Sequence, residues 1–416
     1  MKEKVLNWAQ QFDTFSFLDN NGYNTTPHTI ECILAAGRKR EYCTTAGNAL
    51  AGLQAFINKK NSWLFGHLGF DLKNEIENLS SSHPDRIGFP DLYFFEPEIV
   101  IRFNENEMEI DADDPTDIFQ KIIQNKNSKP FIQSSKIVIQ ELMEREEYIA
   151  IIEKLRQHIL RGDCYEINFC QEFFAENTVI NPVEVYKRLS GISPNPFSAI
   201  YRVDDKWLIC ASPERFLKKE GIRLISQPIK GTMPRSANKD NEARKELLNS
   251  AKDRSENVMV VDLVRNDLAK VCKNGSVQVD ELFGVYSFPQ VHHLISTVSG
   301  ELRDEVSLSE ILRATFPMGS MTGAPKKNVL KLIEKYEKTK RGIFSGALGY
   351  ISPCKSFEQH PDFDFNVVIR SIMYNAADSV LSFQAGSAIT FYSQAEKEWE
   401  ECLLKAKAIK QVLGDN

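Results

Sequence analysis

Hydrophobic residues recur at helical spacing in several parts of this chain. Before Gly162, apolar residues three and four apart share one helical face: Tyr148, Ile151, Ile152, Leu155 and Ile159. A second helix is predicted after Gly323, with Pro325 tolerated in its first turn. A capping-box pattern at Ser393 and Glu396 predicts the start of a last helix, whose buried face contains Trp399, Cys402, Leu403 and Ala406.

Short apolar runs bounded by turn residues predict strands elsewhere. These runs lie at residues 92–95, 99–101, 167–174, 207–211, 224–229, 367–373 and 380–383. Strands and helices come in groups and do not alternate strictly. This order favours an α+β fold with antiparallel sheets.

One polar segment is the best candidate for a boundary inside the chain. Residues 111–114 are mostly acidic, and residues 124–130 are almost entirely polar, as in an exposed connection. We therefore expect an N-terminal part at residues 1–130 and a C-terminal region at residues 131–416.

Composition excludes several classes of protein. The 416 residues are 42% hydrophobic and 26% charged, as in a globular protein, and the net charge of −6 offers no footprint for nucleic acid or an anionic membrane. No apolar run is long enough to span a bilayer, and the first residues lack a secretion signal. The eight cysteines form no Cys-x-x-Cys pair, so we expect free thiols and a cytoplasmic location.

The most informative short segment is residues 228–232 (PIKGT), where Lys230 follows an apolar run that is predicted to be a strand. The pKa of a free lysine is near ~10.4, so only about one in a thousand is neutral and nucleophilic near neutral pH. Burial beside a strand end lowers this pKa and frees the amine. The ordinary alternative is a solvated lysine in a turn.

Other polar residues are predicted at the ends or within these elements. Glu214 directly follows the strand at 207–211, and Arg370 falls inside the apolar run at 367–373. Their ordinary alternatives are a surface carboxylate and a structural ion pair. His292 and His293 are neighbours on a strand and so point to opposite faces, which argues against a metal site made by that pair.

Acidic residues and glycines supply the remaining candidates. Glu256 precedes an apolar helical run, and Glu398 and Glu401 stand one turn apart in the last helix, where capping and a pair with Lys405 are the ordinary explanation. Residues 319–326 (GSMTGAPK) lack the spacing of a phosphate loop. A glycine-rich turn into a helix still offers backbone N–H groups to an anion.

Taken together and in order, the motifs of this chain resemble those of the chorismate-utilising enzymes, the family containing component I of anthranilate synthase and of aminodeoxychorismate synthase. The resemblance covers about residues 140–412 and is weaker at 65–72 and 90–97. The matching motifs are 212–216 (SPERF), 228–232 (PIKGT), 253–267 (DRSENVMVVDLVRND), 293–294 (HL), 319–326 (GSMTGAPK), 365–371 (FNVVIRS), 384–388 (QAGSA) and 398–401 (EWEE).

The resemblance implies antiparallel sheets packed as a sandwich and flanked by helices, with chorismate as substrate and Mg²⁺ as cofactor. Glu256 and Glu401 would hold the ion, with Glu398 as a further candidate. Glu214 would be the general acid for the ring hydroxyl, and His293 would lie beside the leaving group or the ring carboxylate. The implied substrate-binding residues are Arg370, Ser320, Thr322, Gly323, Gly386 and Ser387.

Lys230 distinguishes the branches of this family. The amine-forming enzymes that make 4-amino-4-deoxychorismate for para-aminobenzoate and folate carry lysine here, whereas anthranilate and isochorismate synthases usually carry alanine. Isochorismate synthases also carry a lysine base where this chain has Glu166, and the amine-forming enzymes commonly carry glutamine. We hypothesise that Glu166 holds or deprotonates incoming ammonium. Anthranilate synthase component I, and an inactive chorismate-binding or amidotransferase-activating partner, remain as alternatives.

The resemblance also bears on partners. No glutaminase segment is recognisable, so we expect ammonia to come from a separate glutamine amidotransferase subunit in a heterodimer. The Leu-Leu-Glu-Ser element of tryptophan-regulated relatives is matched poorly by residues 17–20 (FLDN), so we do not expect tryptophan regulation.

Overall fold

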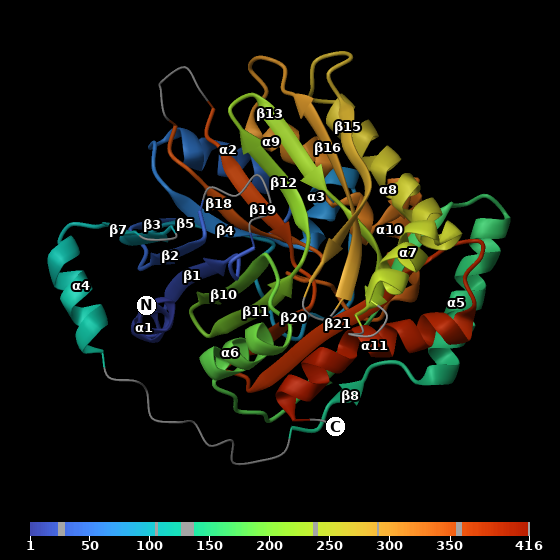
Figure 1. The fold of residues 1–416 in the computed structure, drawn as a ribbon, viewed down its shortest axis with the longest axis horizontal. Helices are drawn as coiled ribbons and strands as arrows, with labels where there is room; N and C mark the ends of the chain where they lie inside the picture. Colours follow the sequence, from blue (N-terminus) through green and yellow to red (C-terminus); the bar gives the residue numbers. More distant parts are fainter. Residues whose placement is uncertain are drawn as a thin grey trace.

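The computed structural model describes residues 1–23, 30–104, 107–125, 137–235, 240–288, 291–354 and 360–414. Two large antiparallel sheets pack face to face, and helices cover their outer faces (Figure 1). The expected α+β fold, with a sandwich of antiparallel sheets, is confirmed.

The first sheet, sheet A, has eleven strands within the described residues. In spatial order they are β17 (Gly323–Ala324), β9 (Glu166–Ala175), β21 (Val380–Ile389), β20 (Ser371–Asn375), β11 (Lys206–Ser212), β10 (Phe197–Val203), β1 (Thr14–Asp19), β2 (Cys32–Ala36), β6 (Ile99–Phe103) and β7 (Met108–Asp111), with β8 (Gln140–Glu141) also pairing β9.

The second sheet, sheet B, has ten strands in the part of the chain that the structure describes. Their order is β14 (Ile229–Pro234), β16 (Val291–Glu301), β13 (Arg223–Gln227), β12 (Arg215–Glu220), β19 (Phe363–Val367), β18 (Ala347–Ile351), β4 (Leu64–Leu68), β5 (Leu92–Glu96) and β3 (Arg40–Thr44), with β15 (Gln278–Ser287) also pairing β16. Both sheets combine strands from before residue 126 and after residue 136. The predicted boundary at 130 lies outside the described residues.

Two groups of helices enclose the sheets. One group packs on sheet A: α1 (Lys2–Ala9), α4 (Pro115–Gln124), α5 (Arg145–Leu160), α6 (Pro182–Ile192), α10 (Lys326–Tyr336) and α11 (Ala395–Leu413). The other packs on sheet B: α2 (Ala49–Asn58), α8 (Ala251–Ala269) and α9 (Leu308–Thr315). Shorter elements are η1 (Phe70–Leu72), α3 (Lys73–Glu77), α7 (Asp240–Asn249) and η2 (Gly319–Met321).

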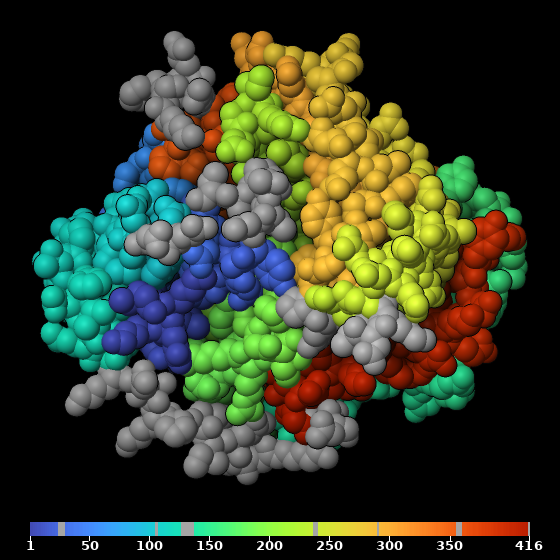
Figure 2. Space-filling model, in the orientation of Figure 1, coloured from blue at the N-terminus to red at the C-terminus, as the bar shows by residue number. Residues whose placement is uncertain are grey.

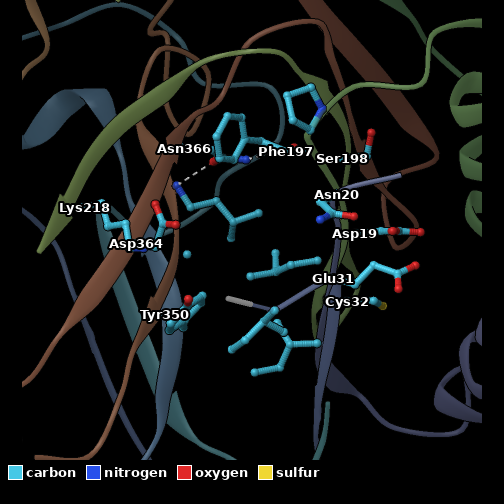
Figure 3. A pocket seen from close by; sticks show the side chains of 16 residues that line it. Asp19, Asn20, Glu31, Cys32, Phe197, Ser198, Lys218, Tyr350, Asp364 and Asn366 are labelled. Carbon is cyan, nitrogen blue, oxygen red and sulfur yellow. Dashed lines mark hydrogen bonds between the residues drawn. The ribbon is translucent and has the colours of Figure 1, made fainter. Parts of the chain in front are cut away.

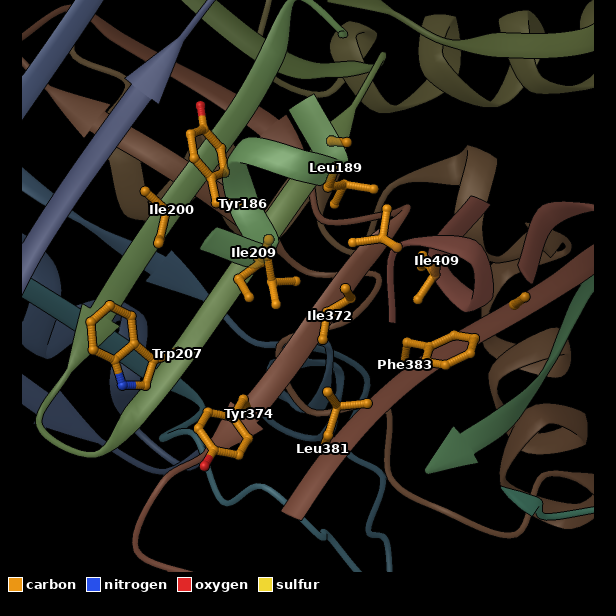
Figure 4. Close-up of a cluster of buried hydrophobic side chains, with 14 of the residues drawn as sticks. Tyr186, Leu189, Ile200, Trp207, Ile209, Ile372, Tyr374, Leu381, Phe383 and Ile409 are labelled. Carbon is orange, nitrogen blue, oxygen red and sulfur yellow. The ribbon is translucent and has the colours of Figure 1, made fainter. Parts of the chain in front are cut away.

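Burial on both faces explains why many strands of sheet A are continuous apolar runs. In β2, Cys32 and Leu34 pack under the helices, while the alternate residues Ile33 and Ala35 face the space between the sheets. Figure 4 shows the helix side, where side chains of α6 and α11 meet those of β10, β11, β20 and β21. Because neither face is solvated, strict polar–apolar alternation is not needed.

Three local predictions were wrong. The run at 367–373 is not one strand, because the chain leaves sheet B after Val367 and enters sheet A at Ser371, with Arg370 at a φ of 51° between them. The run at 224–229 is also divided, so Lys230 lies within β14. The last helix has Gln394 as its N-cap, and the Ser393 hydroxyl accepts from the Thr390 N–H, so no capping box forms.

The predicted strands at 92–95, 99–101, 167–174, 207–211 and 380–383 and the three predicted helices are confirmed. Among the residues that the structure covers, no helix is both long and apolar enough to cross a membrane.

A buried ion pair ties the strand β9 to the loop at η2. The Arg341 guanidinium donates to the Glu337 carboxylate at 2.6 and 3.0 Å and to the backbone carbonyls of Met321 and Asn168, both at 2.8 Å. Glu337 in turn accepts from the Cys170 N–H at 2.9 Å. The side chains of Arg341 and Glu337 are 1% and 3% exposed. This pair therefore holds together two segments that carry candidate site residues.

We expect Arg341→Met to lower the free energy of unfolding by about 3–5 kcal/mol, because Glu337 would be left as an unpaired buried charge. Urea denaturation measures this. The double variant Arg341→Met/Glu337→Met should recover part of the loss, since no buried charge then lacks a partner. Wild-type stability of the single variant would contradict this role.

Candidate active site

The site lies where one edge of sheet A meets one edge of sheet B. Lys230 comes from β14 and His293 from β16, while Glu214 stands just before β12. Glu166, the first residue of β9, faces Lys230 across the two sheets, with 2.7 Å between Oε1 and Nζ. Arg370 enters from the connection between β19 and β20. Residues far apart in the chain are thus brought together as the motifs predicted.

Lys230 is buried and cationic. Its side chain is 9% exposed, as predicted for a lysine beside an apolar strand. Burial alone lowers its pKa, but the nearby carboxylates of Glu166, Glu256 and Glu214 outweigh burial and leave the pKa raised. The expectation of a lowered pKa is therefore wrong for this structure, and an amine nucleophile here must lose a proton to a neighbour.

Glu214 differs from Lys230, because its burial favours the neutral, protonated form of the side chain. It is 4% exposed, and burial raises its pKa to about 7, although the Ser320 hydroxyl, Lys230 and Arg370 work in the other direction. A carboxyl group with this pKa is partly protonated at neutral pH and is able to donate a proton. The alternative of a surface carboxylate is excluded.

His293 and Arg370 form a polar pair beside Glu214. Arg370 donates to Nε2 of His293 at 3.2 Å, and Nδ1 of His293 lies 2.9 Å from the Thr232 hydroxyl. Burial, with Arg370 adding to it, lowers the pKa of His293 well below its usual value, so the ring is neutral. Burial also lowers the pKa of Arg370, to about 10, and the guanidinium stays charged at neutral pH.

The two adjacent histidines have different surroundings, as the strand geometry predicted. His292 contacts the Ser287 hydroxyl at 2.9 Å and the Asp240 carboxylate at 3.1 Å, whereas His293 contacts Thr232 and Arg370.

Glycines allow backbones to approach closely at the sheet A side of the site. A Cβ on Gly386 of β21 would lie 1.9 Å from the Phe169 carbonyl oxygen, and a Cβ on Gly323 would lie 2.0 Å from that of Glu166. Gly323 also has a φ of +146°. Both positions therefore require glycine for packing of β17 and β21 against β9, whatever else they bind.

In the glycine-rich turn at residues 319–326, two of the backbone N–H groups that the sequence offered to an anion are used inside the turn itself. Ser320 and Thr322 are buried, and so is Ser387 on β21. The N–H groups of Met321 and Thr322 donate to the carbonyls of Met318 and Gly319. These two amides are thus already hydrogen-bonded and are not free for an anion.

Carboxylates from α8 and α11 gather around one lysine that the sequence reading missed. The Lys252 ammonium lies 3.5 Å from Glu398, 3.8 Å from Glu256 and 3.9 Å from Glu401. The sequence did offer one indication of this contact, because Lys252 and Glu256 are four residues apart in a predicted helical segment. Lys405, which pairs with Glu401 at 2.8 Å as the ordinary reading had it, also donates to the Gly386 carbonyl. Figure 2 shows α7 and α8 (yellow) close to α11 (red) on one face.

Three observations bear on whether the cluster of Glu256, Glu398 and Glu401 suits a divalent cation. Oε1 of Glu256 and Oε2 of Glu398 are buried and lack a hydrogen-bond partner among the described residues. Burial raises the pKa of Glu256 to about 7, a sign that its charge is undercompensated. Within the same residues no group of three or more His, Cys, Asp or Glu is arranged to hold a metal on its own. The donor set therefore fits an ion such as Mg²⁺ that takes one or two carboxylates and completes its shell elsewhere.

A separate cavity of about 60 Å³ lies between the sheets (Figure 3). Asp19, Cys32 and Ser198 line it from sheet A, and Tyr350 and Asn366 line it from sheet B. It contains none of the predicted site residues. The poorly matching segment at residues 17–20 contributes to its wall through Leu18, Asp19 and Asn20.

Known proteins match this chain over nearly its whole length. The family described as chorismate binding enzyme matches residues 13–411. The anthranilate synthase component I-like protein of Synechocystis is 34% identical, over 89% of this chain and 76% of the relative. Aminodeoxychorismate synthase component 1 of Escherichia coli is 32% identical, over 84% and 76%. The structure of anthranilate synthase component I from Streptococcus pneumoniae has a TM-score of 0.79 at 26% identity, covering 94% and 93%.

We expect Glu214→Gln to stabilise the protein increasingly as pH rises from about 4.5 to 7, and to keep that gain above pH 7. Between pH 4.5 and about 7 the folded protein keeps a proton on Glu214 that the unfolded chain loses, so wild-type stability falls as pH rises through this range. Glutamine mimics the protonated form. In urea denaturation, the variant should nearly match the wild type at pH ~5 and exceed it by about 3 kcal/mol at pH ~8.

The matched control is Glu246→Gln, which changes an exposed glutamate on α7. It should show no such pH-dependent gain. An equal difference for both variants at the two pH values would refute the buried-acid description of Glu214.

Proposed function

Because the chain belongs to the family of chorismate binding enzymes, we propose that it is component I of an aminodeoxychorismate synthase. It converts chorismate and ammonia to 4-amino-4-deoxychorismate, the precursor of para-aminobenzoate and folate. The observation that carries this choice is Lys230 in the segment PIKGT, which is buried, hydrogen-bonded to Glu166 and influenced by the charge of Glu214. Curated relatives named aminodeoxychorismate synthase component 1, at 30–33% identity, support it.

Lys230 supplies the nucleophile in this proposal. Its Nζ adds to the ring carbon next to the carboxylate-bearing carbon, the two conjugated double bonds of the ring shift, and the bond from carbon to the hydroxyl breaks. Glu214 donates its proton so that the hydroxyl leaves as water, because hydroxide is a poor leaving group. Ammonia then adds where the hydroxyl stood and displaces the lysine.

The neighbouring polar groups bind and orient the substrate. Arg370 is a buried guanidinium suited to a carboxylate of chorismate, and the neutral His293 beside it would lie against the leaving group or the ring carboxylate. Ser320, Thr322, Gly323, Gly386 and Ser387 would line the ring and its carboxylates from the turn and from β21.

Glu256 and Glu401, with Glu398 beside them, are the residues that would hold Mg²⁺. When bound, the ion would supply positive charge to the ring carboxylate and so favour departure of the hydroxyl. The unpartnered carboxylate oxygens of Glu256 and Glu398 support this assignment.

A separate glutamine amidotransferase would provide the ammonia as the partner in a heterodimer. The names of the relatives as component 1 agree with a second component. The cytoplasmic location remains a prediction, and it is compatible with the eight cysteines, all free.

The function is tested by incubating the purified chain with chorismate, Mg²⁺ and ammonium at pH near ~8.5, where part of the ammonium is free ammonia. We expect mass spectrometry to find 4-amino-4-deoxychorismate without pyruvate, and Lys230→Ala to lose or redirect this product. Anthranilate with pyruvate from both proteins would instead identify an anthranilate synthase. No turnover of chorismate by either protein would favour an inactive binding partner.

We also expect Lys252→Met to bind Mg²⁺ about tenfold more tightly than the wild type, because the lysine cation then no longer occupies the space among the three carboxylates. Titration calorimetry without chorismate measures this. Lys245→Met, at an exposed position of α7, is the control and should not change the affinity. Weaker binding by Lys252→Met would mean that the ion sits elsewhere.

A further inference from the structure

The ion pair between Lys230 and Glu166 is almost fully removed from water. The side chains are 9% and 1% exposed, and 2.7 Å separates Nζ from Oε1. The second oxygen of Glu166, Oε2, is buried and has no hydrogen-bond partner among the described residues. Burying a carboxylate that has one oxygen without a hydrogen bond lowers the stability of the folded protein. Replacing a buried ion pair by apolar residues often makes a protein more stable. A chemical role would account for the presence of the Lys230–Glu166 pair.

A protonated lysine has no lone pair with which to attack a ring carbon, so Lys230 needs a proton acceptor. Three carboxylates face it: Glu166 from β9, Glu256 from α8 and Glu214 from the start of β12. Glu166 alone among these has a hydrogen bond to Nζ in the described structure. Proton transfer requires that contact before any matching of pKa.

The other groups nearby are unsuited to the task. Glu214 must keep its own proton for the leaving hydroxyl, and the carboxylate of Glu256 lies in the cluster around Lys252. On the side of β16, the free ring nitrogen of His293 already accepts from Arg370.

We propose that Glu166 is the base that removes a proton from Lys230 and thereby creates the amine nucleophile. This inference rests on the proposed function, because it assumes that Lys230 attacks the substrate. It assigns Glu166 to the lysine, a role different from that of binding ammonium.

The proton balance closes over one turnover. The proton passes from Nζ to Oε1 of Glu166, Nζ bonds to the ring, and the hydroxyl leaves as water with the proton of Glu214. Ammonia adds to the ring, and the bond from the ring to Nζ breaks, releasing a neutral amine. Glu166 returns its proton to Lys230, and the new ammonium group of the product reprotonates Glu214.

The test uses Glu166→Gln in a single turnover without ammonia. Purified protein is mixed with chorismate and Mg²⁺ between pH ~6 and ~9, quenched at intervals, and the adduct on Lys230 is followed by mass spectrometry of the protein and its peptides. In the wild type, Lys230 and Glu166 share one proton throughout, so the rate of adduct formation should follow only the protonation of Glu214: steady below about pH 7 and falling above it. In the variant, only solvent accepts the proton. We then expect a rate reduced on the order of 10²-fold at pH ~6.

The variant should also differ in the shape of its profile. Without the charge of Glu166, the pKa of Lys230 should be lower than in the wild type, because burial still lowers it and one of the opposing carboxylates is gone. The ratio of the variant rate to the wild-type rate should rise about tenfold per pH unit and level off once the pKa of Lys230 in the variant is passed, because both proteins lose the proton of Glu214 alike. A loss of folding would reduce the rate equally at every pH.

Two further variants guard against a structural explanation. Glu166→Asp keeps the carboxylate and should keep the pH profile of the wild type at a reduced rate. Glu172→Gln removes a glutamate that is 2% exposed on the same face of β9 and is paired with Arg86 at 3.1 Å, and it should leave the profile unchanged.

The outcomes separate this inference from the function. A wild-type rate and profile in Glu166→Gln would overturn the role of Glu166. Absence of any adduct in the wild type would also overturn it, whereas the products with ammonia decide independently whether the chain makes 4-amino-4-deoxychorismate.

Discussion

The ion pair between Lys230 and Glu166 joins the two sheets at the point where the candidate site lies. β9 belongs to sheet A and β14 to sheet B, so this contact spans the sandwich. In an interior shielded from water, each charge near the pair shifts the others. Lys230 stays protonated because carboxylates surround it, and Glu214 keeps a proton because burial outweighs the cations beside it. The candidate site thus brings a partly protonated carboxyl group and a protonated lysine together in a buried environment.

A second buried ion pair, Arg341–Glu337, holds the segments around the candidate site in place. Arg341 and Glu337 connect β9 to the turn before α10 through hydrogen bonds to backbone groups on both segments. Close approach of β17 and β21 to β9 adds a second restraint, since Gly323 and Gly386 leave no space for a side chain. Glu166 at the start of β9 is therefore placed by rigid neighbours.

Much of the fold could be predicted because the local pattern determines it. The helices at α5, α10 and α11 and the strands β9 and β11 follow directly from apolar spacing. The prediction of one strand at residues 367–373 was wrong because of tertiary structure. The apolar run is continuous since its residues are buried in both sheets, but the chain passes from sheet B to sheet A within it. Nothing local marks that crossing except Arg370, a charge in an apolar run.

The candidate site residues come from motif resemblance, whereas their electrostatics required the structure. The raised pKa of Lys230 depends on Glu166, which is 64 positions away in the chain. The position of Lys252 among three carboxylates likewise depends on how α8 packs beside α11. Sequence identifies candidate groups, but the charges that face one another are determined by the packing of the sheets and helices.

The most direct measurement is a crystal structure of the Lys230→Ala variant with chorismate and Mg²⁺ bound. The account predicts that the ring hydroxyl lies within hydrogen-bond distance of Glu214 and that the ring carbon next to the carboxylate-bearing carbon faces the space left by the lysine. The ring carboxylate should lie against Glu256 and Glu401 through the ion. A ring hydroxyl turned away from Glu214, or chorismate bound elsewhere, would contradict the account.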